Sequence, residues 1–133
     1  AHQTLVVELD AMLRRYGTTF SRYDVLVLLV HSRAGALPLS KIGQRLQVHA
    51  TSVTNVVDRL EAAGLVRREP NPQDGRGTLA VITAAGRDLA RRATADLNAA
   101  RFGLSALGLD ELRQLFAVLR GLRAGTGDFL GVN

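Results

Sequence analysis

The sequence predicts a mainly helical fold with one small β-hairpin. Three observations support this prediction: two short helices joined by a three-residue turn, a following pair of strands, and amphipathic helical segments on both sides. Helix, turn and helix followed by a hairpin is the element order of a winged helix-turn-helix. The chain has 133 residues, so we expect one domain, with its core over 21–83, helices over 1–16 and 84–124 and a loose tail over 125–133.

The composition excludes several classes of protein. The chain has no cysteine, which rules out disulfides, thiolate nucleophiles and cysteine-ligated metals. The longest apolar run, residues 25–30, is far shorter than the roughly 20 residues of a membrane helix. Residues 1–4 lack a basic region and an initiator Met. We therefore expect a trimmed start without a secretory signal, and a soluble cytoplasmic protein.

The charge balance favours a nucleic-acid partner without locating a binding face. The formal net charge is +5, and all but one of the 17 basic residues are Arg. Arg pairs with phosphates and guanine edges through two parallel hydrogen bonds. The surplus is spread along the chain, however, and frequent Arg also arises from a genomic composition bias.

Two helices are expected before the helix-turn-helix. Apolar side chains spaced by three and four residues predict an amphipathic helix over 5–16. Ser21, followed three residues later by Asp24, resembles a capping box and predicts a second helix to about Arg33. Its segment 25–30 is apolar on all sides and rich in β-branched residues, which also allows a strand. The cap and the length favour a buried central helix.

The next segment predicts the helix-turn-helix and the hairpin. Pro38 predicts a short extended piece over 37–39, and Ser40 is expected to cap the helix that follows. The expected order is a helix over 41–46, a turn over 47–49, a helix over 51–63, a strand over 65–69, a loop over 70–75 and an antiparallel strand over 78–82. Two further helices are expected over 84–106 and from about residue 110, the first with an apolar stripe that includes Leu89, Ala93 and Leu97.

The helix over 51–63 has the pattern of a DNA-reading helix. At 100° per residue, Val53, Val57 and Leu60 share one face. The outer face and its flanks carry Thr51, Ser52, Thr54, Asn55, Asp58 and Arg59. Short polar side chains form helices poorly but suit close approach to base edges in a major groove. The alternative is a solvated surface helix without this function.

The hairpin provides candidate contacts to the DNA backbone and minor groove. Arg76 is expected at the tip, where a narrow hairpin can insert it into a minor groove. Asp74 is expected to orient Arg76 through a side-chain pair. Arg67 and Arg68 on the preceding strand are expected to contact phosphates. A polar turn with incidental charges is the alternative for this segment.

The run Asp-Gly-Arg-Gly-Thr-Leu-Ala-Val-Ile-Thr-Ala-Ala-Gly over 74–86 resembles the wing signature of MarR-type transcriptional regulators. Residues 56–68 resemble the end of the recognition helix and the first wing strand of that family. The resemblance spans nearly the whole chain. It implies a homodimer in which the first and last helices interlock and each subunit places one recognition helix in successive major grooves. The position after Thr54 is often Arg in this family and is Asn55 here, so no base preference is carried over.

Apolar faces over 5–13 and 112–122 support the dimer independently, because no third layer of the chain is available to cover them. Packing of these two faces on each other within one chain is the alternative. The resemblance also implies a possible small aromatic or anionic effector between the dimerisation helices and the winged helix. Candidate lining residues, each also explained by simple packing, are Met12, Arg15, Tyr16, Tyr23 and His31.

The sequence therefore predicts a double-stranded-DNA-binding regulator, a ligand-responsive repressor that acts as a homodimer on a near-palindromic operator. The expected contact residues are Ser40, Lys41, Arg45, Arg67 and Arg68 for phosphates, Thr51, Ser52, Thr54 and Asn55 for bases, Arg59 for either, and Asp74 and Arg76 for the wing. No enzyme activity, cofactor or metal is expected, because the three His are isolated and no catalytic motif stands out. The alternative is a winged-helix module that binds proteins and no DNA.

Overall fold

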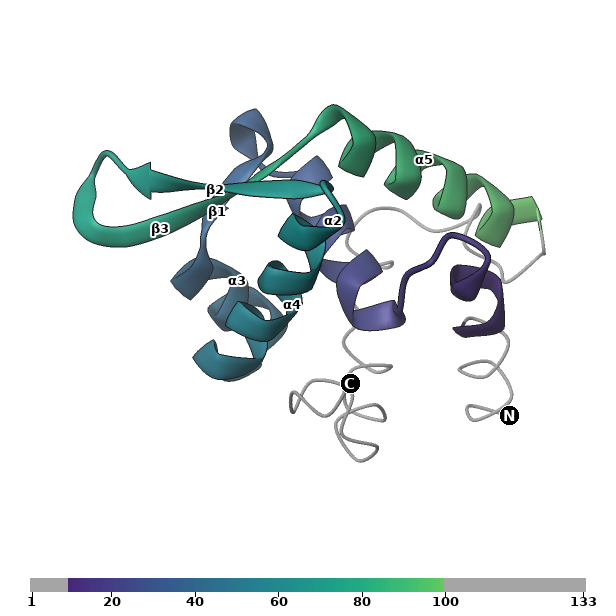
Figure 1. The fold of residues 1–133 in the computed structure, drawn as a ribbon, viewed down its shortest axis with the longest axis horizontal. Helices are drawn as coiled ribbons and strands as arrows, with labels where there is room; N and C mark the ends of the chain where they lie inside the picture. Colours follow the sequence, from purple (N-terminus) through teal and green to yellow (C-terminus); the bar gives the residue numbers. More distant parts are fainter. Residues whose placement is uncertain (1–9, 100–133) are drawn as a thin grey trace.

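The structure, a computed structural model, describes residues 10–99 of the chain. Residues 10–14 are helical and are followed by a turn. The remaining elements are α2 (Phe20–Val30), a 3-10 turn (Arg33–Gly35), β1 (Ala36–Pro38), α3 (Leu39–Leu46), α4 (Ala50–Ala62), β2 (Val66–Asn71), β3 (Asp74–Ile82) and α5 (Ala84–Ala99) (Figure 1). The predicted winged helix-turn-helix is confirmed. The start of the helix expected over 5–16, residues 100–106, the last helix and the tail lie outside the described residues.

The central helix α2 is buried, as the apolar run 25–30 predicted. Its N-cap is Thr19, whose extended backbone lets the hydroxyl oxygen accept a hydrogen bond of 3.4 Å from the Arg22 amide. The prediction that Ser21 is the cap was therefore wrong. Ser21 lies buried in the first turn, with its hydroxyl 3.1 Å from the Thr19 hydroxyl. The helix ends at Val30, three residues before the expected end.

The sheet has three antiparallel strands in the order β1-β3-β2. The sequence predicted the pairing of β2 with β3 but not that of β1, which places Leu37 opposite Ala80. The hairpin is also tighter than the loop expected over 70–75. Pro70 pairs with Thr78, so the strands continue almost to the tip of the hairpin. In Figure 1 the hairpin projects away from the helices as a narrow arm.

The helix-turn-helix consists of α3 and α4. Ser40 was expected to cap a helix that starts at Lys41, but α3 starts two residues earlier, at Leu39, and Pro38 occupies the cap position. Gln47 ends α3 in the left-handed conformation, with φ of 57°. The chain then turns tightly, because the Val48 amide donates to the Gly43 carbonyl over 3.1 Å. The turn expected over 47–49 is confirmed.

The inner face of α4 is part of the hydrophobic core. Val53, Val57 and Leu60 are each at most 2% exposed, which confirms the predicted inward face. Leu89 and Ala93 of α5 are buried as well, in agreement with the predicted stripe. Because one side of α4 is fixed in the core, its opposite side is held outward. Among the described residues, no helix is long and apolar enough to cross a membrane.

Candidate nucleic-acid interface

The outer face of α4 presents short polar side chains near its N-terminus. Thr51 and Thr54 are exposed and Asn55 is half-buried. Ser52 was expected to flank this face, and that placement was wrong, since only 5% of the residue is exposed. Ser52 lies on the side of the helix that also buries Val56, so it is turned toward the protein. Three of the four expected base contacts are therefore accessible.

Two of these side chains differ in their remaining hydrogen-bonding capacity. The Thr54 hydroxyl donates to the Ala50 carbonyl over 3.0 Å, so its proton is used within the helix. Its methyl group and both lone pairs of its oxygen remain available. The side-chain amide of Asn55 makes no hydrogen bond with any residue in the range 10–99. Asn55 can therefore offer both a donor and an acceptor to one base edge.

Several expected phosphate contacts are exposed and uncommitted. Ser40, Lys41 and Arg45 lie exposed on α3, and Arg59 lies exposed near the end of α4. None of the three cations makes an ion pair with another residue in the described part of the chain. They are available for an anionic partner.

The hairpin carries an exposed Arg76 whose backbone is fixed. The Arg76 amide donates to Asp74 Oδ1 over 3.1 Å. The expected pair between the side chains of these residues is not formed, because Asp74 binds the backbone of the hairpin instead. The Arg76 guanidinium has no ion-pair partner among residues 10–99.

Arg67 and Arg68 are committed to carboxylates of the protein. Arg67 Nε lies 2.6 Å from Glu69 Oε2 on the same strand. Arg68 turns toward α4, with Nη2 2.6 Å from Asp58 Oδ1 and Nη1 2.7 Å from Glu61 Oε1. Partial burial lowers the pKa of Arg68, but its hydrogen bonds to Asp58 and Glu61 outweigh this effect and raise that pKa. The expected phosphate contacts of Arg67 and Arg68 stay predictions, but both guanidiniums already pair with carboxylates of the protein.

No clear pattern in the sequence indicated that Glu61 pairs with Arg68. The available signal was weak: Asp58 and Glu61 lie three residues apart on one helix face, and Arg68 follows seven residues later. The remaining accessible candidates lie on α3, α4 and the hairpin. Figure 1 shows these elements together in one half of the molecule, with α5 extending through the other half.

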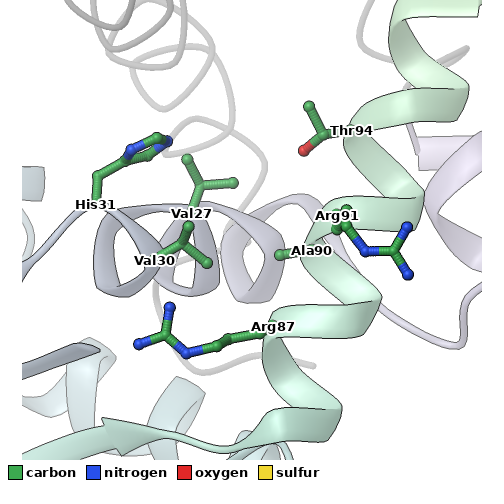
Figure 2. Close-up of a pocket in the computed structure, with 7 residues that line it drawn as sticks. All are labelled: Val27, Val30, His31, Arg87, Ala90, Arg91 and Thr94. Carbon is green, nitrogen blue, oxygen red and sulfur yellow. The ribbon is translucent and has the colours of Figure 1, made fainter. Parts of the chain in front are cut away.

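A pocket of about 370 Å³ lies between α2 and α5 (Figure 2). Its walls are formed by Val27, Val30, His31, Arg87, Ala90, Arg91 and Thr94. Figure 2 shows Arg87 reaching toward α2, whereas the guanidinium of Arg91 points away from the pocket. Arg91 is paired with Asp88 over 2.6 Å, and Arg87 has no ion pair with a described residue. The pocket is mainly apolar with one uncommitted cation.

Of the five residues expected to line an effector site, only His31 lines this pocket. Tyr16 hydrogen-bonds to Asp96, and the guanidinium of Arg92 lies 5.5 Å from the centre of its ring. The hydroxyl of Tyr23 lies 2.5 Å from that of Thr94. Both tyrosines therefore connect earlier parts of the chain to α5. No pattern in the sequence pointed to Arg87, because its place in the pocket depends on the crossing of two helices.

Comparison with known proteins identifies the family. The MarR family model matches residues 19–78. The crystal structure of Sco5413, a MarR family transcriptional regulator from Streptomyces coelicolor, is 54% identical to this chain, with a TM-score of 0.70. The match covers 96% of this chain and 88% of Sco5413. The chain belongs to the MarR family of winged helix-turn-helix transcriptional regulators.

Two other transcriptional regulators share less sequence identity with the chain than Sco5413 does. Sco3205, a MarR family transcriptional regulator of S. coelicolor solved in complex with DNA, is 29% identical, with a TM-score of 0.70; the match covers 92% of this chain and 79% of Sco3205. The HTH-type transcriptional regulator MhqR of Bacillus subtilis is 34% identical over 86 residues, 65% of this chain. The chain spans 58% of the length of MhqR. Membership in a family of transcriptional regulators agrees with the expectation that the chain is not an enzyme.

Proposed function

We propose that this MarR-family protein is a sequence-specific regulator that binds double-stranded DNA as a homodimer. The observation that carries the proposal is the outer face of α4. Thr51, Thr54 and Asn55 project there from a helix whose opposite side is fixed in the core. Short polar side chains on an outward helix suit the edges of bases in a major groove.

The proposed contacts to the DNA backbone surround this face. Ser40, Lys41 and Arg45 on α3 are assigned to phosphates, and Arg59 to a phosphate or a base. The absence of ion pairs between these cations and residues 10–99 supports the assignment. Arg76 is assigned to the adjacent minor groove, where its positive charge meets a concentrated negative potential. The crystal structure of Sco3205 with DNA supports DNA as the partner.

The homodimer is proposed from the family and from the apolar residues over 5–9 and 112–122, which lie outside the described residues. Leu13 does not support it, because the core of this chain already buries that side chain. In a symmetric dimer, the two recognition helices read half-sites about 10 base pairs apart, one turn of the duplex. The operator is then near-palindromic, because the same helix reads each half.

We further propose that the protein is a repressor whose DNA binding responds to a small aromatic or anionic effector. The pocket between α2 and α5 supports this proposal through its apolar walls and Arg87. One wall, α2, packs against α4, and the other, α5, leads into the predicted dimerisation region. A ligand between these helices would change how the two recognition helices are spaced.

Selection of bound sites from random duplex DNA tests the proposal, followed by Kd measurements at about 0.15 M salt. Asn55→Ala should reduce discrimination at one base position in each half-site by about 1–3 kcal/mol. Arg76→Ala should weaken binding without changing the fold. Arg92→Ala on α5 is the matched control and should leave Kd unchanged, since Arg92 lies outside both the proposed interface and the pocket.

Enrichment of no common sequence by the wild-type protein would refute the proposal. Complete absence of salt-dependent DNA binding would favour the alternative of a protein-interaction module. The same selection repeated with aromatic acids such as benzoate tests the response to an effector.

A further inference from the structure

Three charged side chains join the recognition helix to the wing, and we name them the Arg68 cluster: Arg68, Asp58 and Glu61. The guanidinium of Arg68 contacts both carboxylates, at 2.6 Å and 2.7 Å. Glu61 also accepts a hydrogen bond of 3.1 Å from the backbone amide of Arg68. The carboxylate of Glu61 therefore binds both the backbone and the side chain of Arg68 on β2.

The cluster spans more than one turn of α4. Arg68 Nη2 also lies 3.5 Å from the Thr54 carbonyl, four residues before Asp58 on the same face. Thr54 and Asn55 carry proposed base contacts, so the cluster begins directly beside them. On the other side, β2 leads from Arg68 into the hairpin that carries Arg76. The Arg68 cluster therefore connects the two parts of the proposed interface, α4 and the hairpin of β2 and β3.

Within the cluster, the single positive charge of Arg68 offsets part of the negative charge of two carboxylates beside the proposed interface. The side chains of Asp58 and Glu61 are 58% and 42% exposed, whereas that of Arg68 is 25% exposed. An unpaired carboxylate beside DNA phosphates opposes binding by repulsion. Since Arg68 is already committed to both carboxylates, it has little capacity left for a phosphate.

We propose that Arg68 is a positioning residue for DNA recognition, which ties the wing to α4 so that Arg76 and α4 engage the same duplex together. This inference rests on the proposed DNA-binding function. It assigns to Arg68 a role through Arg76 rather than a contact of its own. A phosphate contact by Arg68 would contribute to affinity independently of Arg76, because the two side chains do not touch.

A double-mutant cycle on DNA affinity distinguishes these two roles. Kd for the selected site is measured for the wild type, Arg68→Gln, Arg76→Ala and the double variant. Arg76→Ala should weaken binding roughly tenfold in the wild type. In the Arg68→Gln background the loss should be smaller by about threefold or more, because the wing is no longer held in place. Equal losses in both backgrounds, or no effect of Arg76→Ala in the wild type, would overturn the proposal.

Arg67→Gln is the matched control, since it removes the same charge from the neighbouring position of β2. Arg67 pairs within its own strand and does not join β2 to α4. Its cycle with Arg76→Ala should be additive. If Arg67 and Arg76 were coupled as strongly as Arg68 and Arg76, the proposal would be contradicted. The coupling would then result from the loss of any positive charge on β2.

A second test removes the two carboxylates of α4 that hold Arg68. It replaces the first test if Arg68→Gln does not fold. Asp58→Asn combined with Glu61→Gln eliminates two negative charges, so Coulomb repulsion alone predicts tighter DNA binding. The positioning role predicts in addition that the effect of Arg76→Ala shrinks in this background. An unchanged effect of Arg76→Ala would contradict that role.

The outcomes separate this inference from the function on which it rests. Failure of the wild type to select a DNA sequence would refute the DNA-binding function itself. Selective binding that depends on Arg76 but shows no coupling to Arg68 would refute the positioning role alone.

Discussion

Replacing Gly86 by alanine tests how closely α5 must approach the wing. Gly86 lies in the first turn of α5, where a Cβ would overlap the carbonyl oxygen of Leu65 and lie 2.8 Å from Ile82 Cγ1. Real Cβ atoms essentially never come closer than 3.0 Å to such neighbours. The Leu65 carbonyl is backbone and cannot rotate away, so α5 or the start of β2 must shift.

The expected loss of stability follows from the contacts at this joint. The Leu65 carbonyl accepts a hydrogen bond of 3.0 Å from the Thr83 amide, and the Thr83 hydroxyl donates to the Gly64 carbonyl over 2.7 Å. Overpacking a close contact costs about 1–3 kcal/mol. A strained hydrogen bond adds about 1 kcal/mol. We therefore expect Gly86→Ala to lower the free energy of unfolding by about 2–4 kcal/mol.

Urea unfolding followed by circular dichroism measures this loss, with Gly75→Ala as the matched control. A Cβ at Gly75 would have no atom within 4 Å, and Gly75 has no positive φ, so its substitution should change stability by less than about 0.5 kcal/mol. The slope of the free energy against urea should stay the same in both variants. Equal stability of the two variants would refute the reasoning, because it would mean that α5 does not need this close approach.

Two further predictions concern pH and salt. Burial, followed by the neighbouring charge of Asp24, raises the pKa of the Tyr23 hydroxyl from 10.0 to about 12 against the opposing hydrogen bond from Thr94. The folded state therefore holds this proton more tightly, and up to about 3 kcal/mol of stability present below pH 10 is lost by about pH 12. Tyr23→Phe should flatten this alkaline loss in urea titrations, and an unchanged loss would contradict the assignment. Four proposed contacts near phosphates in each subunit, Lys41, Arg45, Arg59 and Arg76, predict a slope of log K against log salt of about −7 for the dimer, and a slope near zero would contradict them.

The parts of the fold that the sequence predicted best depend on periodicity over many residues. Val53, Val57 and Leu60 repeat with the period of a helix, and all three are buried. The identity of α4 and its inward face were therefore predictable from sequence alone. The outward position of Thr51 and Thr54 follows from the same period, so most of the candidate interface on α4 was predictable too.

Features decided by a single tertiary contact were not predictable. Thr19 and Ser21 are both good capping residues, and local sequence does not choose between them. Phe20 is 2% exposed, and its burial places the start of α2 directly after Thr19. The pairing of β1 with β3 is likewise decided by a tertiary contact and not by the local sequence. Three residues with one proline carry too little pattern to predict a strand, and Leu37 is placed by its contact with the sheet.

The arginines show why charge alone could not locate the interface. Arg67, Arg68 and Arg76 lie within ten residues of each other, and all three carry the same charge. In the structure the first two are paired with carboxylates, and Arg76 has no ion-pair partner among the described residues. The Asp58 partner of Arg68 lies ten residues away on another element, a separation that no local pattern encodes.

The distinction between paired and unpaired arginines also changes how the proposed interface works. An arginine that contacts DNA phosphates directly adds affinity for any sequence, because phosphates are the same everywhere. An arginine that holds the wing against α4 acts on the geometry that lets both elements engage one duplex. Its effect therefore depends on whether the site can satisfy α4 and Arg76 at the same time. In this protein the fixed joint at Arg68 is expected to contribute more to the choice of site than to the general attraction for DNA.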